Sequence, residues 1–248
     1  MLTHIETIPS PVRSSVETYF TQLIQTFASK IDSIYLYGSI VTPDFQPKQS
    51  DINSLVLFDS FSSTELHATR SLVREGLKKR IVAPLCLSVE TFQRSADTFP
   101  LEFIEIQDKH ICLFGEKNRV VDLLIPREYL RVKIEEQIKG KLIRLRQVFM
   151  EHQGLDRELV VILTDAQKQL FPVFRNLLRF LGIENPPVVK DLILQELENR
   201  TQFALLPCRL VWEQITGRTS ITGNIISVYV DYLEVLLKLA KIIDRIHS

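Results

Sequence analysis

The chain has 248 residues, a length that can bury one large core or two modest ones. Hydrophobic residues make up 45% and charged residues 24%, and thirty basic residues balance thirty acidic ones. No overall positive field is therefore present to gather nucleic acid. Three cysteines without a CxxC pair argue against a disulfide framework and against a cysteine zinc site.

The N-terminal stretch lacks an apolar signal core, and no segment approaches the length of apolar sequence that spans a membrane. We therefore expect a cytoplasmic protein without a membrane partner. The sequence leaves open a nucleotide, a protein partner or a second copy of the chain as the binding partner.

The first half alternates helix-like and strand-like segments. Apolar residues recur at three-and-four spacing over 12–29, which predicts an amphipathic helix. Ser62 and Ser63 resemble a helix start, and a second helix is predicted over 65–80. Short runs rich in Ile, Val, Leu and Tyr predict strands over 34–37, 55–58, 81–88 and 111–114, while 92–107 is mixed. Gly76 weakens its helix by about 1 kcal/mol relative to alanine, and we expect it to mark a tight contact with the sheet.

The second half is helical. Strand-like runs stop at Pro126, and the periodicity predicts helices over 127–152, 156–181, 188–197, 205–215 and 223–246. Aromatic and apolar side chains at helix spacing predict a bundle core or a dimer face: Phe171, Phe174, Leu178 and Leu181, and Tyr229, Tyr232, Leu236 and Leu239. We predict an α/β (α+β) domain with a small mixed sheet over 1–118 and an all-α helical-bundle domain over 119–248.

Polar residues cluster between the first two predicted strands. Gly38 and Ser39 follow the first strand directly, and Asp51-Ile52-Asn53 opens the second. A glycine lets backbone amides approach whatever lies above the sheet, and alternate residues of a strand point to the same face. Asp51 and Asn53 should therefore point toward the Gly38–Ser39 turn, as in a site for phosphate and metal.

This motif resembles that of the nucleotidyltransferase superfamily, which includes polymerase-beta-like and kanamycin-nucleotidyltransferase-like enzymes. The family pattern is hydrophobic-Gly-Ser or Gly, a gap, and then Asp-hydrophobic-Asp or Glu. Tyr37-Gly38-Ser39 match it, eleven residues intervene, and Asp51-Ile52 match again, but Asn53 departs. The resemblance implies nucleotide binding by Gly38, Ser39, Asp51 and Asn53. A following helical domain also resembles the antibiotic-modifying branch.

The resemblance also implies a catalytic metal site that this sequence fills incompletely. Nucleotidyl transfer uses two magnesium ions, which the family holds with three carboxylates. Asp51 supplies one, whereas Asn53 is neutral. By-eye alignment places Cys86 at the third position, where a thiol suits magnesium poorly. The nearest other acids are Glu90, Glu102 and Glu105.

Two functions follow from this comparison. We predict a catalytically degenerate nucleotidyltransferase fold that binds a nucleotide or a partner and acts as a regulatory protein. The alternative is an active magnesium-dependent nucleotidyltransferase that moves NMP from an NTP to a small-molecule or protein acceptor. In that case Mg and NTP are the cofactors, and Asp51 is the catalytic residue and the principal metal ligand.

The predicted helix 127–152 carries a basic surplus over 139–146. By resemblance to the antibiotic-modifying enzymes, Lys141 or Arg144 contacts phosphates; a solvated charged face is the alternative. Arg146 and His152 also fit the loose Arg–His spacing of HEPN ribonucleases, a third functional class. On an unbroken helix, however, residues six apart point about 240° away from each other.

Overall fold

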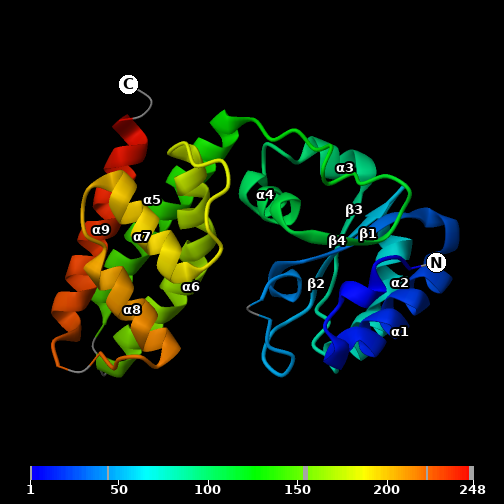
Figure 1. The fold of residues 1–248 in the computed structure, drawn as a ribbon, viewed down its shortest axis with the longest axis horizontal. Coiled ribbons are helices and arrows are strands. Elements are labelled where there is room, and N and C mark those ends of the chain that lie inside the picture. Colours follow the sequence, from blue (N-terminus) through cyan, green and yellow to red (C-terminus); the bar gives the residue numbers. More distant parts are fainter. Residues whose placement is uncertain (1, 44, 153–155, 222, 246–248) are drawn as a thin grey trace. The chain divides into compact units, whose positions relative to one another are not determined.

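The computed structural model describes residues 2–43, 45–152, 156–221 and 223–245. The chain forms two compact units, residues 1–125 and residues 126–248, and each is described separately (Figure 1).

The first unit is built on a four-stranded mixed sheet with strand order β3-β2-β1-β4. The strands are β1 (Ile31–Tyr37), β2 (Asn53–Phe58), β3 (Leu85–Ser88) and β4 (His110–Phe114). β1 runs antiparallel to both β2 and β4, and β3 runs parallel to β2. The small mixed sheet predicted from the sequence is therefore confirmed.

The third strand is shorter than the predicted range 81–88. Pro84 lies immediately before Leu85, and proline cannot donate a hydrogen bond to a ladder, so it is placed at strand ends. Ile81 forms an isolated parallel bridge with Ile52. The Ile52 N–H donates to the carbonyl of Arg80 over 2.8 Å, so the end of the helix that precedes β3 in the chain lies beside the start of β2.

Helices cover both faces of this sheet (Figure 1). The helices are α1 (Ser10–Phe27), α2 (Ser63–Leu77), α3 (Val89–Arg94) and α4 (Pro100–Asp108), with single turns η1 (Ile5–Thr7), η2 (Ala28–Lys30) and η3 (Gly38–Val41). Because side chains alternate along a strand, the sheet builds two cores. One joins α1 to Ile34 and Val56, and the other joins Phe92 and Phe103 to Tyr35.

The first unit continues past residue 118, where the sequence analysis ends the first domain. The Arg119 guanidinium pairs with the Asp32 carboxylate over 2.7 Å, and the Arg119 N–H donates to the Tyr35 hydroxyl over 2.9 Å. Val120 and Leu123 are buried in the core that contains Tyr35. This segment is neither helix nor strand, so its tertiary packing leaves no periodic signal in the sequence.

The second unit consists of helices, as predicted. They are α5 (Arg127–Glu151), α6 (Asp156–Phe180), α7 (Lys190–Thr201), α8 (Leu206–Thr216) and α9 (Ile225–Arg245). Most members of the two aromatic sets are buried inside the unit, which favours the bundle core over a dimer face. Two buried hydroxyls link helices: Tyr229 donates to the Leu145 carbonyl over 2.9 Å, and Tyr232 donates to Gln167 Oε1 over 2.8 Å.

Across the described residues, none of the helices combines the length and the apolar character that a membrane crossing requires.

Gly76 lies where α2 approaches α1 and the chain before β3. A Cβ atom at this position would lie 2.7 Å from Tyr19 Cε2 and 3.0 Å from the Ile81 carbonyl oxygen. The tight contact expected for this glycine is therefore made with α1 and with the bridge residue Ile81. A backbone carbonyl and a buried ring leave little room for relaxation.

We predict that Gly76→Ala lowers the free energy of unfolding by about 1–3 kcal/mol, because overpacking outweighs the gain of about 1 kcal/mol in helix propensity. Urea denaturation followed by circular dichroism measures the change. Ser71→Ala, at an exposed position of the same helix, is the matched control. Equal stabilities of the two variants would contradict the packing account.

Candidate functional site

The turn after β1 brings Gly38 and Asn53 together. Gly38 has a φ of +80°, and an added Cβ would lie 3.0 Å from Asn53 Nδ2. Tyr37 pairs directly with Asn53 across the β1–β2 ladder, so the turn and the start of β2 lie at the same end of the sheet. The Ser39 carbonyl accepts hydrogen bonds from the Thr42 N–H and the Thr42 hydroxyl, both over 2.9 Å, which closes η3.

Asp51 is exposed, and its carboxylate is already paired with a cation. Arg80 Nη2 lies 2.9 Å from Asp51 Oδ1. The same guanidinium donates from Nε to the Ser50 carbonyl over 3.1 Å and from Nη2 to the Gln49 carbonyl. Arg80 thus fixes the backbone before β2 and offsets the charge of the acid that the sequence predicts as a metal ligand.

The backbone at Arg80 supports a specific role for its side chain. The Ile81 N–H donates to the Gly76 carbonyl over 3.0 Å, and the Arg80 N–H donates to the Leu77 carbonyl over 3.2 Å. This pattern is a Schellman motif in which the residue at Arg80 adopts a left-handed conformation, here with φ of +60°. Glycine is the usual residue at that position, so an arginine there is retained at a conformational cost.

No pattern in the sequence indicates a role for Arg80. Only the Ile52–Ile81 bridge, which is a tertiary feature, brings it beside Asp51. A basic residue that follows a predicted helix is too common to serve as a signal.

The strand β3, where the third metal-binding carboxylate is expected, presents other side chains than the predicted Cys86 to the site. Leu55 pairs with Leu85 and Leu57 with Leu87, and Leu57 and Leu87 pack in the core on the Tyr35 face. Asn53 precedes Leu55 by two residues, so it shares that face. The β3 side chains on the Asn53 face are therefore leucines.

Cys86 packs in the opposite core, against α1 and α2, so its predicted place at the third metal position is wrong. The by-eye alignment could not supply the strand register that decides which face a residue occupies. Burial also raises the pKa of the Cys86 thiol to about 11.

The three alternative acids lie on α3 and α4. Glu90 is exposed and pairs with Arg94 over 3.1 Å. Glu102 is exposed on α4, and the pKa of Tyr37 is raised by burial and, to a smaller extent, by the Glu102 carboxylate. Glu105 is half-buried on the same helix. Glu102 is thus electrostatically coupled to Tyr37, which pairs with Asn53.

These donors do not fit a pair of magnesium ions. One exposed carboxylate is bound to a guanidinium, Asn53 offers one neutral oxygen, and the adjoining strand offers leucines. No cluster of three or more His, Cys, Asp and Glu side chains arranged for a metal ion is found in the described part of the chain.

A cavity of about 600 Å³ adjoins η3 at this end of the sheet. Its size is in the usual range for small-molecule sites. Lys109 supplies a cation that the sequence analysis did not assign to the site. The lining residues are Thr7, Pro9, Ile40, Val41, Thr42, Pro43, Gln107, Asp108, Lys109, His110 and Ile111.

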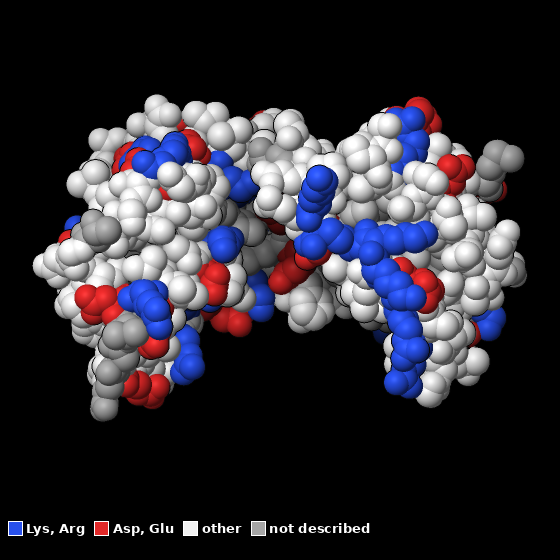
Figure 2. Space-filling view, turned by 90° about the horizontal axis from the view of Figure 1, so that it is seen from below, with Lys and Arg blue, Asp and Glu red and all other residues white. Residues whose placement is uncertain are grey.

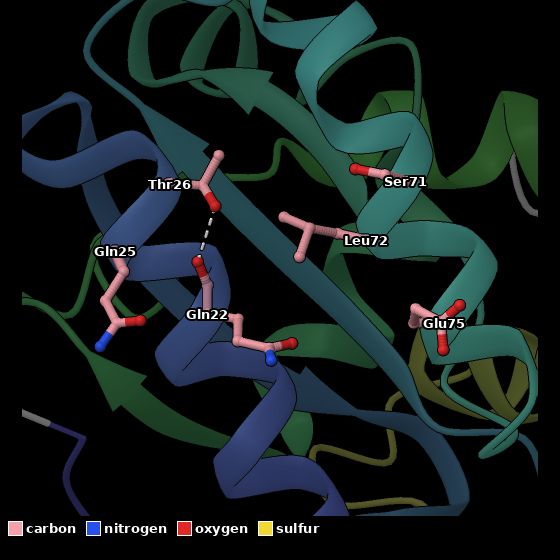
Figure 3. Close-up of a pocket in the computed structure, with 6 residues that line it drawn as sticks. All are labelled: Gln22, Gln25, Thr26, Ser71, Leu72 and Glu75. Carbon is pink, nitrogen blue, oxygen red and sulfur yellow. Dashed lines mark hydrogen bonds between the residues drawn. The ribbon is translucent and has the colours of Figure 1, made fainter.

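A second cavity, of about 370 Å³, lies between α1 and α2 (Figure 3). Two glutamines, a glutamate and two hydroxyls line it with one leucine, and the Thr26 hydroxyl donates to the Gln22 carbonyl over 2.8 Å. It contains none of the predicted site residues. Its lining residues are Gln22, Gln25, Thr26, Ser71, Leu72 and Glu75.

The remaining predicted residues lie in the second unit. Lys141 Nζ donates to Gln169 Oε1 over 2.6 Å, and Arg144 is exposed on α5; their contact with phosphates stays a prediction. α5 ends at Glu151, one residue before His152. The His152 ring lies 4.0 Å from a Glu158 carboxylate oxygen, whereas Arg146 is exposed, so the structure adds no support for a ribonuclease pair.

Substitutions of Arg80 can remove its side-chain contacts with or without relieving the strain of its left-handed backbone. Arg80→Ala removes the ion pair and the bonds to the backbone carbonyls but keeps the strained conformation. Arg80→Gly removes the same contacts and relieves the strain, so we predict that it is more stable than Arg80→Ala by about 1 kcal/mol. Urea denaturation of both variants measures this difference, and an alanine variant at least as stable as the glycine variant would refute it.

Comparisons with known proteins give a similarity in fold. No protein-family model matches the sequence, and no curated protein sequence matches it. Among solved structures, the chain is similar to a spectinomycin adenyltransferase from Enterococcus faecialis, solved with ATP and spectinomycin. The match has a TM-score of 0.58 at 11% identity and covers 91% of this chain and 98% of that chain. The protein therefore has a nucleotidyltransferase-like fold followed by a helical region.

Proposed function

We propose that this protein is a nucleotidyltransferase-fold binding protein that has lost metal-dependent transfer and acts in the cytoplasm as a nucleotide- or partner-binding regulator. The observation that carries the proposal is the ion pair between Asp51 and Arg80, in a site where Asn53 replaces the second acid. Two dications require several anionic oxygens, because nothing else offsets their charge. A guanidinium beside the one available carboxylate disfavours a dication at the same place.

Nucleotide binding without magnesium is compatible with the same geometry. Gly38 holds a left-handed turn against which the Asn53 side chain packs, and the adjoining cavity of about 600 Å³ is lined in part by Lys109. Lys109 supplies positive charge at this end of the first unit, whereas the charge of Arg80 is offset by Asp51. We infer that a bound nucleotide would be held by Lys109 and by the Gly38–Ser39 backbone.

The alternative function is magnesium-dependent transfer of NMP to a small-molecule or protein acceptor. The specific observation in its favour is the similarity in fold to an adenyltransferase solved with ATP and spectinomycin, over nearly the whole of both chains. For this alternative Asp51 would have to leave Arg80 to become a metal ligand, and Glu102 would have to supply a second carboxylate.

The test is a panel of ATP, CTP, GTP and UTP with and without magnesium, measured by isothermal titration and by pyrophosphate release. We predict that magnesium neither strengthens binding nor produces pyrophosphate. Asp51→Ala should leave any nucleotide affinity within about twofold and lower stability by no more than about 1 kcal/mol, because its ion pair is exposed. Glu90→Ala, which removes another exposed paired acid, is the matched control.

Magnesium-dependent pyrophosphate release that is abolished by Asp51→Ala and retained in Glu90→Ala would overturn the proposal. That outcome would establish the transferase alternative.

A further inference from the structure

The two edges of the sheet differ in whether they are covered. At the β4 edge, the Thr3 N–H donates to the Leu113 carbonyl over 2.8 Å, and the Thr3 hydroxyl donates to the Cys112 carbonyl over 3.0 Å. At the β3 edge, no other segment of the described chain forms a backbone hydrogen bond with the outer side of Leu85–Ser88. The sheet is therefore closed at one edge and open at the other.

β3 also lacks the charged side chains that usually protect an open edge. Its residues are Leu85, Cys86, Leu87 and Ser88, with no charged side chain among them, and Leu85 is 37% exposed. Edge strands of soluble proteins are commonly blunted by lysines, bulges or a covering segment. Here the strand is protected by Pro84, which precedes it, and by its short length of four residues, but not by charge. An uncharged open edge is a template for pairing with another backbone.

A largely apolar groove lies beside this edge. α2 and the chain leading into β3 enclose a cavity of about 510 Å³. Leu66, which is 60% exposed, Val73 and Pro84 supply apolar surface, and Arg70 lines the same cavity. The full lining is Phe61, Leu66, His67, Thr69, Arg70, Val73, Ala83, Pro84 and Cys86.

The helix that forms one wall of the groove is fixed in place before any ligand arrives. Ser62 caps α2, and the Glu65 carboxylate accepts from the Ser62 N–H over 2.9 Å, which completes a capping box. Lys30 Nζ lies 2.7 Å from the other oxygen of Glu65. A rigid wall reduces the entropy that a ligand must lose on binding.

Positive charge continues along α2 beyond the groove. Residues 70–80 contain five basic residues and one acid, Glu75. Arg70 and Arg74 are four residues apart, so they lie on one side of the helix. Both are exposed, as is Lys79, and none of these three forms a salt bridge in the described structure. Figure 2 shows Lys and Arg side chains gathered in a band on one face of the first unit.

We infer that the outer edge of β3 and the α2 groove bind an extended peptide segment of a protein partner that carries both apolar and acidic side chains on one face of its strand. The peptide backbone would add a strand to β3, so every second side chain would face α2, where the apolar ones would enter the groove and the acidic ones would meet Arg70 and Arg74. A nucleic acid would use the cations but neither the strand edge nor the apolar groove, and a neutral chain is a poor general binder of nucleic acid.

This inference supplies the partner class for the regulatory role proposed above, and it rests on that role. Its test uses neither nucleotide nor magnesium. Peptide binding can therefore be absent when the nucleotide titrations agree with the proposed function, and it can be present when they do not. The two failures are therefore distinguishable.

The probe is a panel of fluorescein-labelled heptapeptides titrated with the full chain and followed by fluorescence polarisation. Every second residue, on the face turned toward α2, is Val, Leu, Phe, Glu or Asp, with at least one apolar and one acidic residue in each peptide, and the residues between them are Ser or Thr. We expect saturable binding and slowed amide hydrogen exchange over residues 83–88. N-methylation of alternate backbone amides in the best peptide should weaken binding at least about tenfold, because it removes the donors that a new strand needs.

The protein variants separate the groove from general charge. Arg70→Glu/Arg74→Glu should weaken binding at least about tenfold, and Leu66→Glu should weaken it through the loss of apolar surface. The matched control is Arg157→Glu/Lys241→Glu, which makes the same charge change at exposed positions of the second unit and should bind as the wild type does.

Three outcomes would overturn the inference. The first is that no peptide of the panel binds saturably. The second is that Arg70→Glu/Arg74→Glu and N-methylation leave binding unchanged. The third is that a twenty-nucleotide oligothymidylate competes for the same site and binds it more tightly than every peptide. Circular dichroism of each variant shows that its fold is retained, so a loss of binding reports on the surface itself.

Discussion

The ion pair between Asp51 and Arg80 is the interaction on which the account of this protein depends. It forms because the bridge between Ile52 and Ile81 places the end of α2 beside the start of β2. The arginine occupies a left-handed position that favours glycine, and its guanidinium binds two backbone carbonyls as well as the acid. The same contact thus shapes the segment before β2 and neutralises the acid that could ligate a metal.

The rest of the site follows from the two faces of the sheet. Alternation along β2 and β3 sends Asn53 and Leu87 to one face and Cys86 to the other. The face that would hold metal ligands carries an amide and leucines, and the opposite face is filled by α1 and α2. The Gly38–Ser39 turn therefore lies at an end of the sheet where little negative charge is presented.

The sequence predicted the architecture well because its signals were local. Strand-like runs separated by helical periodicity gave the mixed sheet, and the second half gave the helical bundle. The end of the first unit was misplaced because residues 119–125 pack through single contacts, such as Arg119 with Asp32, that have no period. Gly38 and Asn53 lie together, as expected, since both positions follow from the strand ladder, and their role in binding a nucleotide stays a prediction.

What the sequence could not provide were relations between elements. The register between β2 and β3 decides the face of Cys86, and a one-residue error reverses it. The pairing of Asp51 with Arg80 spans 29 positions and depends on the turn after α2. The open edge of β3 is likewise invisible in a sequence, because strand order is set by the whole sheet.

Binding of manganese, a paramagnetic substitute for magnesium, tests the central claim most directly. Electron paramagnetic resonance can count the manganese ions bound per chain in the presence of a non-hydrolysable ATP analogue. The account predicts no protein-dependent site for manganese beyond the ion carried by the nucleotide itself. Two tightly bound ions per chain, with one or both lost in Asp51→Ala, would contradict it.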